Sequence, residues 1–288
     1  MKKKVEVGVI NITMHPHSPE KYVELIRSAR KLDKPIHLMG TSWAELTDVH
    51  QLQFSEDQIK PIYGDIYKYI NFDKDSEWFN KETKQHATDK EKEKTREIEH
   101  LRPNSIRFTF MLFPELHLIV YSAYENQKRL TPKLATIFFN KLLNHPSLFE
   151  VYGPINVTHM PTESVVEDII KLPKKRKLEL VITRPNALKN TEQKFLEKMN
   201  AQNAQKIEQN YTAVPDTSLN VDESLKENIQ IAAKYGHAKV SGRDEHDHSV
   251  TIDTKQVPFL ASDIYDDKNT TSMDAFRRLA ETVVDFFR

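Results

Sequence analysis

The sequence has 288 residues, a length between the usual sizes of one and two domains. Its 42 basic residues equal its 42 acidic residues, so the whole molecule is not a polycation. The lack of cysteine excludes disulfides, thiolate zinc sites and cysteine nucleophiles. We find no export signal and no apolar stretch of transmembrane length, so we expect a cytoplasmic protein without membrane insertion.

Alternating valines near the start of the sequence predict a strand. After Val5, Val7 and Val9, apolar residues occupy both faces, which is typical of a strand covered on two sides. Ser18 provides an N-cap with proline directly after it, and a helix is expected from there to about Lys31. Segments rich in β-branched and aromatic residues predict further strands at 36–38, 43–46 and 62–72.

A long polar segment separates these strands from the next apolar ones. From 80 to 100 apolar residues are almost absent, and we expect a solvated loop. Apolar residues at every second position then predict a hairpin with arms 106–112 and 118–120. Thr131 begins another helix of the cap-and-proline kind, and a strand is expected over 149–158.

A second group of elements follows Pro161. Ser164 and Glu167 have capping-box spacing and predict a helix. Gly236 stands where a helix C-cap glycine is expected. Further expected elements are a strand at 178–183, helices at 191–207 and 222–235, hairpin arms at 238–242 and 249–254, and a helix from Ser272 to the end.

These elements predict an α+β fold with two lobes, each a mainly antiparallel sheet with packed helices. The expected N-terminal lobe is 1–160. The expected C-terminal lobe is 161–288, with a basic segment and the terminal helix. That helix is expected either to dock on the core or to pair with a second copy in a homodimer.

No complete catalytic motif is present, so we assign no catalytic residue, metal or cofactor. The sequence lacks a glycine-rich phosphate loop, a nucleophile elbow and a metalloprotease motif. Asp244, His246, Asp247 and His248 are ligand types that could hold a divalent ion. A metal-dependent nuclease or hydrolase is therefore an alternative, although the same string is typical of a charged hairpin tip.

Positive charge is concentrated in one segment. Over 171–211, ten basic residues stand against four acidic ones, which favours contacts with nucleic-acid phosphates. Few aromatic residues accompany them, which favours sequence-tolerant duplex binding over base stacking. The competing interpretation is a solvated connection that protects a sheet edge from aggregation. The predicted nucleic-acid-binding residues are Lys174, Lys175, Arg176, Lys177, Arg184, Lys189, Lys239 and Arg243.

Several segments resemble proteins of phage defence. VINITMHPHSPE (9–20), PIYGDIY (61–67) and FMLFPELH (110–117) look like a bacterial family of unassigned function found among anti-phage defence genes. LELVITRP (178–185) and KVSGRD (239–244) are distantly similar to the phage-exclusion protein RexA and the KwaB subunit of the Kiwa system. The resemblance implies a dimeric DNA-binding protein that reports or blocks phage replication, together with an effector or phage protein as partner.

We therefore predict a non-catalytic anti-phage defence protein that binds the backbone of nucleic acid, DNA rather than RNA. Besides the metal-dependent enzyme, a third hypothesis is a protein-interaction adaptor in a defence system. In that case the aromatic-rich first lobe and the last helix would make the contacts.

Overall fold

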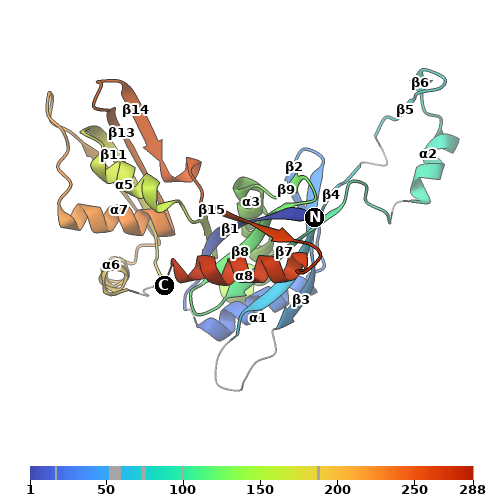
Figure 1. Cartoon of the computed structure of the whole chain (residues 1–288), viewed down its shortest axis with the longest axis horizontal. Helices are drawn as coiled ribbons and strands as arrows, with labels where there is room; N and C mark the ends of the chain where they lie inside the picture. The colour runs from blue at the N-terminus through green and yellow to red at the C-terminus, as the bar shows by residue number, and fades with distance from the viewer. Residues whose placement is uncertain (17, 52–59, 73–75, 99, 187–188, 288) are drawn as a thin grey trace.

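The computed structural model describes residues 1–16, 18–51, 60–72, 76–98, 100–186 and 189–287 (Figure 1). Two main sheets dominate it, and every strand pair described is antiparallel. The predicted α+β class with mainly antiparallel sheets is confirmed. Within the described part of the chain, no helix combines the length and the apolar character needed to cross a membrane.

The larger sheet has nine strands in the order β10-β1-β8-β7-β4-β3-β2, with β15 also paired to β1 and β9 to β8. Its strands are β1 (Lys2–Thr13), β2 (Ile36–Met39), β3 (Ser42–Gln51), β4 (Ile62–Ile70), β7 (Ile106–Phe113), β8 (Leu118–Glu125), β9 (Lys128–Arg129), β10 (Asn156–His159) and β15 (Leu260–Asp266). The predicted hairpin is confirmed as β7 and β8.

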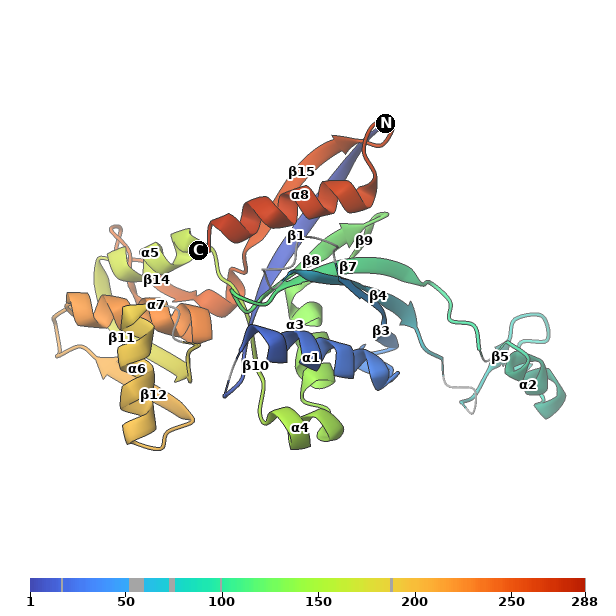
Figure 2. The same ribbon diagram turned by 90° about the horizontal axis from the view of Figure 1, so that it is seen from below.

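Helices cover both faces of this sheet (Figure 2). One face packs on α1 (Pro19–Lys31), α3 (Pro132–Leu143) and α4 (Pro146–Tyr152). The opposite face packs on α8 (Ser272–Asp285). Ile10 and Val9 on β1 are both buried, the first toward α1 and α3 and the second toward α8. β1 is thus the doubly covered central strand that its apolar pattern predicts.

The smaller sheet has the order β12-β11-β13-β14. One of its faces forms a core with three helices, to which Leu178, Leu180 and Ile182 of β11 contribute. Alternate residues of β11, such as Lys177 and Glu179, lie outside that core. The elements of this lobe are α5 (Glu163–Lys171), β11 (Lys174–Thr183), α6 (Asn190–Ala201), β12 (Lys206–Thr212), α7 (Glu223–Tyr235), β13 (Gly236–Arg243), β14 (Ser249–Asp253) and the 3₁₀ turn η1 (Thr254–Gln256).

The end of the chain returns to the first lobe, which differs from the expected division at residue 160. β15 pairs with β1 over seven residues, and α8 packs on the face of β1 that carries Val5, Val7 and Val9. The physical reason is that β1 has a second apolar face, which the apolar stripe of α8 covers. The terminal helix therefore docks on the first core.

Four local predictions need correction. The expected strand over 149–158 is split, because α4 continues to Tyr152 and β10 starts only at Asn156. The expected helix over 191–207 ends at Ala201, and the missed strand β12 follows. Thr162, rather than Ser164, caps α5. The polar segment 80–100 contains the short helix α2 (Asp89–Arg96) beside a small hairpin of β5 (Phe79–Asn80) and β6 (Gln85–His86), which projects from the body in Figure 1.

Gly236 is the C-cap residue of α7, but its backbone is extended, with a φ of −177°. Glycine is needed at this position because β13 approaches β11 closely, and not because the backbone makes a left-handed turn. A Cβ at this position would collide with the backbone oxygen of Val181 on the paired strand β11. Gly236 therefore lets β13 start directly against β11, at the end of the sheet that faces the first lobe.

We predict that Gly236→Ala lowers the free energy of unfolding by about 1–3 kcal/mol, because the added methyl must push the two strands apart. Urea denaturation measures the change. Ser241→Ala on the same strand adds no atom and should change stability by less than about 0.5 kcal/mol. Equal stability of the two variants would show that the strands separate without cost.

Candidate functional site

The predicted basic run lies inside β11 and not before it. Side chains alternate between the faces of a strand, so a run of consecutive charges is divided between them. Lys177 and Lys239 both flank Glu179: Lys177 forms an ion pair with it, and Lys239 Nζ lies 3.8 Å from its Oε2. The hydrogen bond from Lys177, followed by the charges of both lysines, holds the pKa of Glu179 below its usual value. One carboxylate thus compensates two predicted phosphate contacts.

The hairpin tip between β13 and β14 holds the carboxylate that compensates two more of the predicted basic residues. Lys174 Nζ lies 2.8 Å from Asp247 Oδ1, and Arg243 Nη1 lies 2.5 Å from Asp247 Oδ2. Asp244 accepts hydrogen bonds of 2.9 Å from the backbone N–H groups of His246 and His248. Among the residues that the structure describes, no three His, Asp or Glu side chains form a metal-binding group. The geometry therefore gives no support to the metal-dependent enzyme.

The remaining predicted residues have separate environments. Lys175 is buried, which lowers its pKa, and its Nζ donates to the backbone oxygen of Leu172 at 2.7 Å. Arg176 and Arg184 each donate a guanidinium hydrogen bond to an oxygen of the second lobe. Lys189 is exposed at the start of α6. The predicted set does not combine into one uncompensated cationic face.

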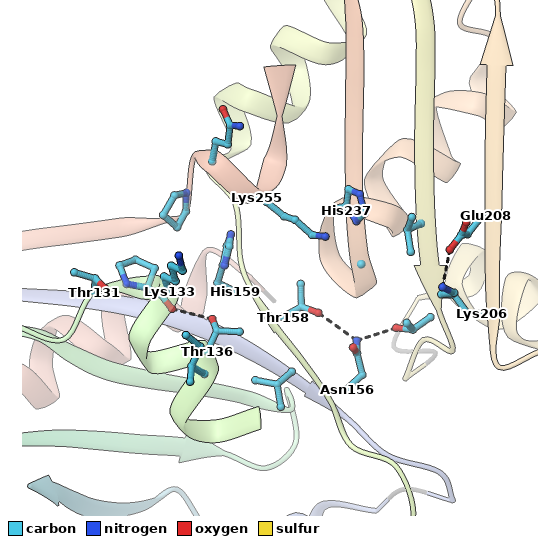
Figure 3. A pocket seen from close by; sticks show the side chains of 18 residues that line it. Thr131, Lys133, Thr136, Asn156, Thr158, His159, Lys206, Glu208, His237 and Lys255 are labelled. Carbon is cyan, nitrogen blue, oxygen red and sulfur yellow. Dashed lines mark hydrogen bonds and ion pairs between the residues drawn. The ribbon is translucent and has the colours of Figure 1, made fainter. Parts of the chain in front are cut away.

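A cleft of about 850 Å³ between the lobes gathers a different set of basic side chains (Figure 3). It is bordered by the start of α3, by β10, by the ends of β11, β12 and β13 that face the first lobe, and by η1. Glu208 is the one carboxylate among the described lining residues, and it lies 2.6 Å from Lys206. The basic residues that line the cleft are Lys133, His159, Lys206, His237 and Lys255.

Burial lowers the pKa of both His159 and His237, and the positive charge of Lys255 lowers both further. The imidazoles are therefore mostly neutral at pH 7, since an unperturbed histidine titrates at about 6.5. Other charged groups that face these rings are Asp253 and, for His237, Glu179, Glu208 and Lys239. The charge of Lys255 thus acts on one imidazole from each lobe, His159 of β10 and His237 of β13.

Three asparagines join the lobes beside the cleft. Asn156 Nδ2 donates to Thr183 Oγ1 at 2.8 Å. The amides of Asn11 and Asn186 each donate to a backbone oxygen of the opposite lobe at 3.0 Å, and Tyr22 donates its hydroxyl to Asn186 at 3.1 Å. Asn11 and Asn186 are almost fully buried, so their hydrogen bonds are shielded from water and contribute to holding the lobes together. Each of these three asparagines therefore connects the first lobe with the second.

Sequence reasoning missed this site because its residues are far apart in the chain. Lys133, His159 and Lys255 carry no shared motif. α3 and β10 contact each other within the first lobe, and the contact between the lobes adds Lys255. One feature of the site could be predicted from the sequence. The helix start at Thr131 and Pro132 places Lys133 in the first turn of α3.

Fold and site define a two-lobed α+β protein with a basic cleft between its lobes. The chain belongs to the family described as a domain of unknown function, DUF4747, whose model matches residues 3–281. A search of curated proteins found no significant match. The resemblance to phage-exclusion proteins therefore stays a prediction.

We predict that Lys255→Met raises the pKa of both His159 and His237. Removal of the positive charge makes each protonated imidazolium easier to form. A pH titration followed by NMR of the imidazole protons measures both values. Lys268→Met, at an exposed position outside the cleft, is the control and should leave them unchanged. Unaltered values in the Lys255 variant would contradict the described electrostatics.

Proposed function

We propose that the protein binds nucleic acid through phosphate groups that enter the cleft between the lobes, as a non-catalytic component of anti-phage defence. The observation that carries this proposal is the convergence of basic side chains from separate elements on one concave site. Glu208 is the one carboxylate among the described lining residues, and it pairs with Lys206. Phosphate binding requires local positive potential and not a positive total charge.

Lys133 and Lys255 are the main proposed phosphate contacts. Neither ammonium group has an ion-pair partner among the described residues, so a phosphate would displace no carboxylate. Lys133 also lies in the first turn of α3, where the helix dipole adds positive potential. Lys174 and Lys177, in contrast, would have to exchange a carboxylate for a phosphate.

The size of the cleft favours one strand over a duplex. A volume of about 850 Å³ is that of an ordinary ligand pocket, which holds a few nucleotides at most. Ile137, Val157 and Val181 provide apolar wall for sugars or bases. The described lining contains no Phe, Tyr or Trp, so the proposed contacts are made to phosphates and not by base stacking. We therefore propose single-stranded nucleic acid in place of the duplex.

The biological setting rests on the resemblance of the sequence to defence families. The same resemblance supports DNA as the nucleic acid, a homodimer, and an effector or phage protein as a further partner. Cytoplasmic localisation belongs to the proposal as well.

We predict that Lys133→Gln combined with Lys255→Gln weakens binding of single-stranded DNA by about tenfold or more, since two phosphate contacts are lost. The slope of log affinity against log salt should fall by about 1.4. Fluorescence anisotropy over a range of salt concentrations measures both quantities.

The matched control is Lys174→Gln combined with Lys177→Gln, which removes the same total charge. Because both lysines already have carboxylate partners, we expect a change below about twofold. Equal losses in the two double variants would mean that binding depends on net charge and not on the cleft. Failure of the wild type to bind DNA would refute the proposal.

A further inference from the structure

We infer that a second, smaller pocket on the first lobe binds a phosphate group between the ammonium groups of Lys68 and Lys128. This β4–β9 pocket has a volume of about 240 Å³, which suits a single ionic group. Its basic lining residues are Lys68, Lys128 and Arg129, and no Asp or Glu is among its described lining residues. It shares no described lining residue with the cleft, so the inference goes beyond the proposed function.

The two lysines reach the pocket from different strands. Lys68 is on β4, and its Nζ donates to the backbone oxygen of Arg129 on β9 at 2.9 Å. Lys128 directly precedes Arg129, and its Nζ donates to the backbone oxygen of Asn104 at 3.2 Å and to the side-chain oxygen of the same residue. The ammonium group of Lys68 is therefore held against the short strand that carries Lys128.

The charges of this lysine pair are not compensated. Neither lysine forms an ion pair with another described residue, and the guanidinium of Arg129 is already paired with Glu6 at 2.7 Å. Lys68 is half-buried, and burial followed by the positive charge of Lys128 lowers its pKa. Charges that leave water are normally paired, so two like charges at one pocket are unfavourable until an anion enters.

The hydrogen-bonding capacity of the pair matches phosphate. An ammonium group has three donors. Lys68 uses one of them and Lys128 uses two in the bonds described, so two donors of Lys68 and one of Lys128 remain for a ligand. A phosphate group offers three acceptor oxygens, whereas a carboxylate offers two. Bonds between an ammonium group and a phosphate are also charge-assisted, which makes them stronger than neutral ones.

The test is a titration with inorganic phosphate, followed by NMR of the backbone amides of Asn104, Lys128 and Arg129. Sodium chloride of equal ionic strength is the reference. We expect saturable shifts with phosphate and none with chloride. Lys68→Gln combined with Lys128→Gln should weaken phosphate binding by about tenfold or more, and Lys68→Gln alone, which breaks one described bond, by less. The matched control, Lys133→Gln combined with Lys255→Gln, should keep the shifts, because it removes the same charge outside this pocket.

Equal shifts with phosphate and chloride, or equal phosphate binding by wild type and the Lys68 and Lys128 double variant, would overturn the inference. Single-stranded DNA then distinguishes the source of the phosphate. If the double variant also loses affinity for DNA, the group belongs to a nucleic-acid backbone, and if only phosphate binding is lost, it belongs to a small phosphorylated molecule. If wild type binds phosphate but no DNA, this pocket stands and the proposed function falls.

Discussion

The arrangement of the molecule depends on buried amide hydrogen bonds between its lobes. Asn11 and Asn186 lie at 1% exposure and donate to backbone oxygens of the opposite lobe. Separation of the lobes would exchange each of these hydrogen bonds for one to water, so each bond contributes about 0.5–1.5 kcal/mol to the closed arrangement. Asn156, which lines the cleft, makes a further bond between the lobes, to Thr183. The cleft is thereby formed in advance, and a ligand need not order it.

Local pairing, and not the total charge, decides where an anion can bind. On the second sheet and its hairpin tip, Asp247 and Glu179 each compensate two basic side chains. In the cleft the positive charges are not compensated in this way. Lys133 and Lys255 line it without a carboxylate partner among the described residues. A neutral protein can therefore carry a positive site, provided that its acidic residues lie elsewhere.

Patterns of neighbouring residues predicted much of the fold. The helix start at Ser18 and the alternating valines of β1 were sufficient, because caps and strand periodicity are local properties. β12 and β15 were missed, since their burial patterns are mostly exposed and leave little apolar alternation. The basic run in β11 was visible, but its partner Asp247 is distant in sequence. The cleft required the contact between lobes, which no local pattern encodes.

The most direct test of the account is an NMR measurement of the imidazole pKa values of His159 and His237 with and without a single strand of DNA. Burial and Lys255 hold both values low in the free protein, and a bound phosphate brings negative charge to the same space. We predict that both pKa values rise when the strand binds. A strand that binds and leaves both values unchanged would place its phosphates outside the cleft and contradict the account.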